Sequence, residues 1–176
     1  MAARGAQKLP VVGAAPVCVR CAARGPTCCE PTDGVALAPL TPGDVVRIQR
    51  ATGLTPKDFT TERPVDDEER AALEEQDPIL RGLVHDGRLV SLAKSARGAC
   101  VFHERDRGCT LSYEMRPLLC RRYPIVRRGA QLSVSPGGAC LAIDEAANMP
   151  ELLQSLGLSL DALSAIDQQI QRDLDC

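Results

Sequence analysis

The chain has 176 residues, and its 21 Lys and Arg nearly balance its 23 Asp and Glu, for a formal net charge of −2. A chain of this length favours one compact domain over two independent cores. The balanced charge excludes the strongly basic surface typical of proteins that bind nucleic acid or anionic lipid. We therefore expect neither a nucleic-acid nor a membrane partner. The sequence leaves open whether the chain binds another protein.

The cysteines are the most unusual part of the composition, since there are nine of them against only four aromatic residues. Aromatic side chains usually bury the most area each, so their scarcity predicts a weak core. Metal that binds only the folded chain would add its binding free energy to folding and offset that deficit.

The N-terminal residues predict a cytoplasmic location. Their apolar run is interrupted by Pro10, Gly13 and Pro16, unlike the core of a signal peptide, and no stretch approaches the roughly 18 apolar residues of a membrane span. In a reducing cytosol, clustered cysteines bind metals or take part in catalysis rather than form disulfides.

In chain order, we expect a flexible lead over residues 1–17, a cysteine-cluster metal-chelating domain over 18–145, and a C-terminal helical segment over 146–176 that packs on the same domain. The domain opens on a loop broken by Gly25 and Pro26, which can fold four nearby thiols inward around a metal. These thiols belong to Cys18, Cys21, Cys28 and Cys29.

Helix signals dominate the stretch that follows. Thr41 offers an N-cap, Pro42 a first helical residue and Gly53 a stop, so we expect a helix over 42–52. Further helical segments are expected as a single turn anchored by Phe59, as an exposed acidic helix or mobile insertion over 66–76, and as a short helix over 78–84.

Short strands and hairpins follow. The expected elements are a strand over 88–93, a hairpin of strands 100–103 and 109–112, a helix over 113–121, a second hairpin of 125–127 and 131–135, and a loop over 136–140. Ser112 would cap the helix over 113–121, and Pro117 destabilises that helix least if it lies in the first turn.

Beyond Pro150 the pattern becomes helical. Leu152, Leu153 and Leu156 precede a cap at Ser159. Apolar residues then recur at three- and four-residue spacing, at Leu160, Leu163, Ile166, Ile170 and Leu174. Together these patterns predict an α+β fold, small and irregular, with short helices and hairpins gathered around the thiols and a C-terminal helix packed on them.

Four more thiols lie in the second half, at Cys100, Cys109, Cys120 and Cys140. Eight thiols suffice for two four-thiolate sites, and either Zn²⁺ or an iron–sulfur cluster such as [4Fe–4S] accepts such a set. Adjacent side chains tend to point apart, so we expect Cys28 and Cys29 to serve different sites. A [4Fe–4S] cube tolerates wider spacing between its cysteine sulfurs than a single zinc ion does, which slightly favours an iron–sulfur cluster. The structural alternative is a set of buried free thiols.

Other polar residues near the thiols have two interpretations each. His103, three residues after Cys100, is either a nitrogen ligand or an ordinary core residue, whereas His85 and Cys176 are expected to be solvated and free. Eight arginines between residues 97 and 128 would offset the negative charge of thiolate centres, or form a solvated basic face. Arg116 and Arg121 are candidates to hydrogen-bond cluster sulfurs, or to form surface ion pairs.

Several spacings together resemble one protein family. They are Cys18-x2-Cys21 with Cys28-Cys29, Gly98-Ala-Cys100-Val-Phe, the block Cys109-x3-Tyr113-Glu-x-Arg116-Pro117-x2-Cys120-Arg121-x-Tyr123-Pro124, and Cys140. Over residues 18–140 the chain resembles the YkgJ-type cysteine-cluster proteins, which implies a zinc- or iron-chelating domain of the CxxCxxxxCC kind. Flagellin lysine N-methylase has a similar cysteine-cluster region, but it is a longer protein. The resemblance therefore does not imply that this chain transfers methyl groups.

The sequence lacks the familiar signatures of catalysis. It contains no Cys-x3-Cys-x2-Cys, GxGxxG, P-loop or HExxH motif, and the first Cys-x2-Cys lacks the βαβ surroundings of a redox dithiol. Three functions remain: an iron–sulfur protein with a redox or accessory role, a structural zinc-binding interaction module, and a thiol-based metal-delivery or methyltransferase-related protein.

Overall fold

The computed structural model describes residues 16–25, 27–31, 37–135 and 139–175. Within these ranges the fold is α+β, as predicted, with short helices, small antiparallel sheets and a long C-terminal helix. The helices are α1 (Pro16–Arg24), α2 (Pro42–Thr52), α3 (Pro56–Phe59), α4 (Asp67–Gln76), η1 (Pro78–Leu80), η2 (Tyr113–Met115), α5 (Leu118–Arg122), α6 (Leu141–Glu145), α7 (Met149–Leu156) and α8 (Leu160–Leu174). The strands are β1 (Thr60–Pro64), β2 (Val84–His85), β3 (Arg88–Leu92), β4 (His103–Glu104), β5 (Gly108–Cys109), β6 (Ile125–Arg128) and β7 (Gln131–Val134).

The first thiols lie on a helix rather than in the expected loop. α1 carries both Cys18 and Cys21, and a spacing of three residues places them on one helix face. Val17 and Ala22 on the same helix are buried, and their packing holds α1 on the domain. Pro16 and Val17, which were predicted to belong to the flexible lead, are therefore helical, and residues 1–15 lie outside the described ranges.

The capping signals of α2 and α3 are confirmed. Thr41 and Asp44 form a capping box at the start of α2, and Gly53 ends it in the left-handed region with φ 73°. Thr55 starts α3, whose last residue Phe59 is fully buried. The acidic segment forms α4, and none of its residues is fully buried, although Leu73 packs partly against the larger hydrophobic cluster.

Two predicted helices are wrong in extent. The helix expected over 78–84 is only the 3₁₀ turn η1, and Val84, its expected last residue, is the first residue of β2. The helix expected over 113–121 is divided by Pro117 into η2 and α5. Arg116 is extended there (φ −64°, ψ 145°), because a following proline disfavours the helical conformation.

β3 is confirmed and lies at the centre of a three-stranded antiparallel sheet, between β1 and β2. β1 was not predicted, since its sequence Thr-Thr-Glu-Arg-Pro lacks apolar alternation and it is paired only through β3. The first expected hairpin exists as β4 and β5 but is shorter, and Cys100 lies outside it in an isolated bridge to Lys94. The second hairpin, β6 and β7, is confirmed.

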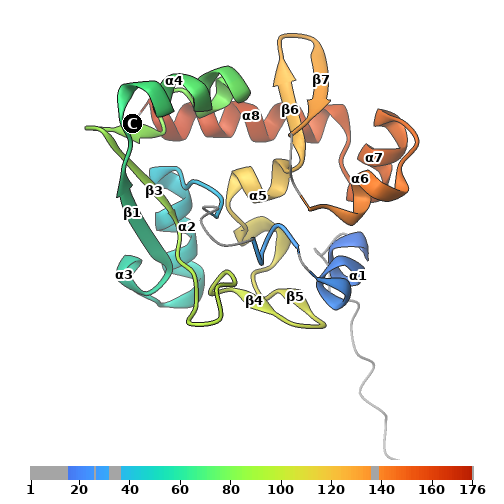
Figure 1. Cartoon of the computed structure of the whole chain (residues 1–176), viewed down its shortest axis with the longest axis horizontal. Helices are drawn as coiled ribbons and strands as arrows, with labels where there is room; N and C mark the ends of the chain where they lie inside the picture. Colours follow the sequence, from blue (N-terminus) through green and yellow to red (C-terminus); the bar gives the residue numbers. More distant parts are fainter. Residues whose placement is uncertain (1–15, 26, 32–36, 136–138, 176) are drawn as a thin grey trace, which may run out of the picture.

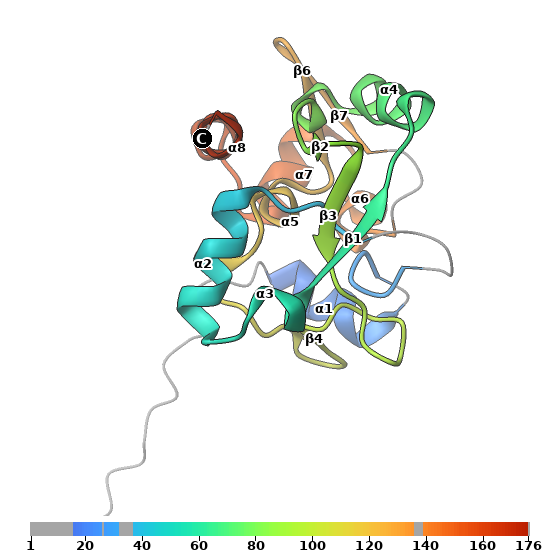
Figure 2. The same cartoon turned by 90° about the vertical axis from the view of Figure 1, so that its left-hand side faces the viewer.

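The C-terminal helices close the core. Figures 1 and 2 show α8 running along one edge of the molecule, and it contacts α5 and α2. Leu163, Ile166 and Ile170 are buried there, as their spacing predicts, whereas Leu160 is 57% exposed. None of the described helices has the length and apolar character needed to cross a membrane.

Leu163→Ala is expected to destabilise the domain by about 2–5 kcal/mol, because the side chain is fully buried against its neighbours and its loss leaves a cavity. Leu160→Ala, one turn earlier on the exposed side, is the matched control and should change the unfolding free energy by less than about 0.5 kcal/mol. Urea denaturation of both variants measures the difference, and equal effects would contradict this placement of α8.

Candidate metal centre

Two distant stretches of the chain meet around the thiols. The backbone N–H of Cys100 donates a hydrogen bond to the carbonyl of Cys29 at 2.7 Å. Gly108 lies against α1, where an added Cβ would be 3.6 Å from the carbonyl oxygen of Cys18. All eight cysteines within the described ranges are free, so the N-terminal thiols and the later ones are brought together by packing and not by disulfides.

The first group of thiols consists of Cys18, Cys21 and Cys140. All three pack against the larger hydrophobic cluster, which α7 and α8 also line. Cys140 precedes α6, and α6 is tied to α1 by Arg20, whose two guanidinium nitrogens donate to the carboxylate of Glu145 at 2.7 Å each. Burial raises the pKa of Cys18 to about 11 and raises that of Cys140, so both thiols favour the protonated form.

The second group consists of Cys29, Cys100, Cys109 and Cys120, which pack with a separate hydrophobic cluster. The pair Phe59 and Phe102 lies in that cluster, with ring centroids 5.9 Å apart. Burial raises the pKa of Cys100 to about 12 and also raises those of Cys109 and Cys120. Nearby Cys29 adds to each of the three shifts, and it also adds to that of Cys18 in the first group.

Cys28 connects the two groups. It is exposed, and its thiol shares a hydrogen bond with Cys29, which raises the pKa of Cys28 and lowers that of Cys29. Although the residue is exposed, burial of its sulfur also raises its pKa, as do Cys120 from the second group and Cys18 from the first. The adjacent pair therefore lies where the two groups meet, with Cys29 packed in one of them and Cys28 at the surface.

Arg116 supplies a buried positive charge beside the thiols. Its side chain is 7% exposed, its Nε donates to the carbonyl of Leu111 at 3.3 Å, and its charge lowers the pKa of Cys18, Cys29 and Cys109 against the effect of burial. Arg116 is therefore buried, and the alternative prediction of a surface ion pair for this residue is wrong. Arg121 instead lies over a tyrosine ring, 4.8 Å from the centroid of Tyr113.

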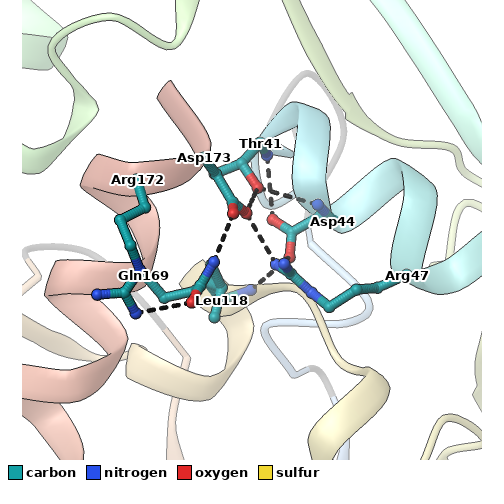
Figure 3. A network of polar contacts seen from close by, with 7 residues as sticks. All are labelled: Thr41, Asp44, Arg47, Leu118, Gln169, Arg172 and Asp173. Atoms are coloured by element: carbon teal, nitrogen blue, oxygen red, sulfur yellow. Dashed lines mark hydrogen bonds and ion pairs between the residues drawn. The ribbon is translucent and has the colours of Figure 1, made fainter. Parts of the chain in front are cut away.

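A polar network positions α5, the helix that carries Cys120 (Figure 3). The carboxylate of Asp44 accepts hydrogen bonds from the backbone N–H groups of Thr41 and Leu118, both at 3.0 Å. Arg47 donates to Asp44 at 2.6 Å and to Asp173 of α8 at 3.0 Å. This carboxylate therefore joins the starts of α2 and α5. Its burial raises the pKa of Asp44.

Close packing of α2 on α8 needs the glycine in this network. Asp173 also accepts a hydrogen bond from the hydroxyl of Thr41 at 2.6 Å. Gly43 faces the same carboxylate, and an added Cβ at this position would overlap it. The glycine of the Thr-Pro-Gly-Asp sequence therefore permits close approach of the two helices, a role that its helix-start pattern does not reveal.

The two histidines lie in different environments. His85 is exposed, with Nδ1 3.1 Å from Asp86. His103 is buried, its Nδ1 lies 3.6 Å from Glu30, and its Nε2 has no hydrogen-bond partner among the described residues. The pairing of β4 with β5 sets His103 opposite Cys109. Cys176 lies outside the described ranges.

The side chains do not form a ligating geometry as they stand. Within residues 16–25, 27–31, 37–135 and 139–175, no three Cys, His, Asp or Glu side chains are arranged so that they could hold a metal ion. The donor chemistry nevertheless fits a soft metal, because the thiols converge from both halves of the chain and a buried guanidinium accompanies them.

Comparisons with protein-family models, curated proteins and solved structures find no match. The resemblance to the YkgJ-type proteins therefore depends on the quoted residues alone and stays a prediction.

Proposed function

We propose that this protein binds metal through two thiolate centres. One would be held by Cys18, Cys21, Cys28 and Cys140, and the other by Cys29, Cys100, Cys109 and Cys120. The observation that supports this division most is the packing of the thiols on two separate hydrophobic clusters, with the adjacent pair between them. It also agrees with the expectation that neighbouring cysteines serve different sites.

Metal and protons compete for these sulfurs. Burial raises the pKa of Cys18, Cys100, Cys109 and Cys120, so in the absence of metal these thiols keep their protons at neutral pH. Thiolates are the ligating form, so binding of either metal releases protons. Arg116 would offset part of the negative charge that collects when several thiolates share one metal.

We propose iron–sulfur clusters, because a cube accepts more widely spaced sulfurs than a single zinc ion does. Bound clusters would supply one-electron redox chemistry, in a redox or accessory role. The cysteine content suits a reducing compartment, which supports a cytoplasmic location. Zinc in the same two sites would instead make the domain a structural interaction module.

A second candidate is metal delivery by a thiol pair. Cys28 is exposed and shares a hydrogen bond with Cys29, whose pKa is lowered by that bond and by Arg116. An accessible thiol beside a more acidic one is suited to ligand exchange with another protein's thiols. This candidate predicts a metal that leaves the protein readily.

Anaerobic purification followed by iron, zinc and acid-labile sulfide analysis tests the proposal. We expect brown protein with about eight iron and eight sulfide per chain, as two [4Fe–4S] clusters require. Colourless protein with about two zinc ions would retain the thiolate sites but replace the redox role by the structural one. Protein that holds neither metal, even after anaerobic reconstitution with iron and sulfide or with Zn²⁺, would refute metal binding.

A further inference from the structure

Tyr123 carries a buried hydroxyl that the fold does not use. The residue follows α5, and its backbone N–H donates to the carbonyl of Leu119 at 2.9 Å, so its position continues the helix that bears Cys120. The side-chain oxygen is shielded from solvent and has no hydrogen-bond partner in the described part of the chain. Buried tyrosine hydroxyls usually find a partner, so this oxygen needs an explanation.

The nearest charged neighbours of the phenol are thiols. Burial raises the pKa of Tyr123, and the sulfurs of Cys28, Cys140, Cys21 and Cys29 add to that shift. Three of the four belong to the first proposed centre, and they come from α1, the turn after it and the start of α6. The unpartnered oxygen and the first group of ligands therefore occupy the same region of the interior.

We propose that the hydroxyl of Tyr123 donates a hydrogen bond to a metal-bound cysteine sulfur of the centre formed by Cys18, Cys21, Cys28 and Cys140. This inference rests on the proposed function and adds a positioning residue to it. A phenol keeps its proton at neutral pH and is a donor, whereas a metal-bound thiolate is an acceptor. The bond would hold the sulfur in place and withdraw charge from it, as hydrogen bonds around metal ligands do.

Tyr113 offers a matched control. Like Tyr123 it is half-buried, but it packs on the larger hydrophobic cluster and lies beneath the guanidinium of Arg121, which is 4.8 Å from the ring centroid. Tyr123→Phe and Tyr113→Phe each remove one hydroxyl and keep the ring. A difference between the two variants therefore reports on the position of the hydroxyl and not on the loss of a phenol.

The test is a competition titration of the full chain with Zn²⁺ against a chromophoric chelator, because Zn²⁺ reports on thiolate sites whichever metal is native. We expect Tyr123→Phe to bind as many zinc ions as the unaltered protein, with one of them about 10-fold or more weaker. Tyr113→Phe should match the unaltered protein. The thermal stability of metal-free Tyr123→Phe should not fall, because the hydroxyl has no partner in the described residues without metal.

Two results would overturn the inference while leaving metal binding intact. One is an unchanged zinc affinity in Tyr123→Phe. The other is a loss of metal-free stability that accounts for the whole weakening, which would make the hydroxyl merely structural. Absence of Zn²⁺ binding by the unaltered protein would instead overturn the proposed centres together with the role of Tyr123.

Discussion

Asp44→Ala is expected to destabilise the protein by about 3–5 kcal/mol, in line with the loss of one partner from a buried ion-paired network. The substitution would leave the buried N–H of Leu118 without its acceptor and would remove the capping box of Thr41. Arg47 would lose one of its two carboxylate partners and keep Asp173. Urea denaturation of the metal-free protein gives the value directly.

Asp58→Ala is the matched control, because Asp58 plays the same capping-box role for Thr55 at the start of α3 but is fully exposed. We expect a much smaller loss there, since water can replace the missing acceptor. Asp44→Asn keeps one carbonyl oxygen as an acceptor, so its loss of stability should lie between those of Asp44→Ala and Asp58→Ala. If Asp44→Ala were no more harmful than Asp58→Ala, the carboxylate would not be what joins α2 to α5.

Cys28→Ser and Cys120→Ser are each expected to remove about half of the bound metal, because the two cysteines belong to different proposed centres of four thiolates. The double variant should retain almost none. Both single variants should also melt at lower temperature than the metal-loaded parent, since lost metal is lost folding free energy. Metal analysis by mass spectrometry and thermal melts of anaerobic samples give both quantities.

Cys176→Ser controls for a thiol outside the resemblance, and we expect it to keep the full complement of metal. The stability of the metal-free proteins separates ligation from packing. Cys28 is exposed, so its substitution should change metal-free stability little, whereas burial raises the pKa of Cys120, which packs among apolar neighbours, and its substitution should also weaken packing. Unchanged metal content in Cys28→Ser and Cys120→Ser would remove both residues from the ligand set.

Local signals account for the elements predicted correctly. The cap at Thr41, the stop at Gly53 and the leucine spacing of the C-terminal segment act within one or two helical turns, so they are visible in the sequence. The division of the helix at Pro117 also has a local cause and could have been predicted from the residue before the proline. β1 could not, because its pairing depends on β3 rather than on its own side chains.

The candidate site divides in the same way. Residue type and spacing alone predict the eight cysteines as the candidate ligands, and they also single out Arg116 and Arg121 as candidate partners of the sulfurs. Their grouping was not predictable, because Cys140 joins Cys18 and Cys21 through the packing of α6 on α1. The unpartnered hydroxyl of Tyr123 left no local signal, since tyrosines at such positions are most often ordinary core residues.

The sequence by itself determined the α+β class, the ends of α2, the long amphipathic α8 and the eight cysteines that we propose as sulfur donors. Tertiary structure alone decided that Asp44 receives the N–H of Leu118, 74 residues away, and that the thiols divide between two apolar clusters. The physical reason is range. Caps and helical periodicity act between residues a few positions apart, whereas a contact between distant residues depends on how whole helices pack, which no short stretch of sequence specifies.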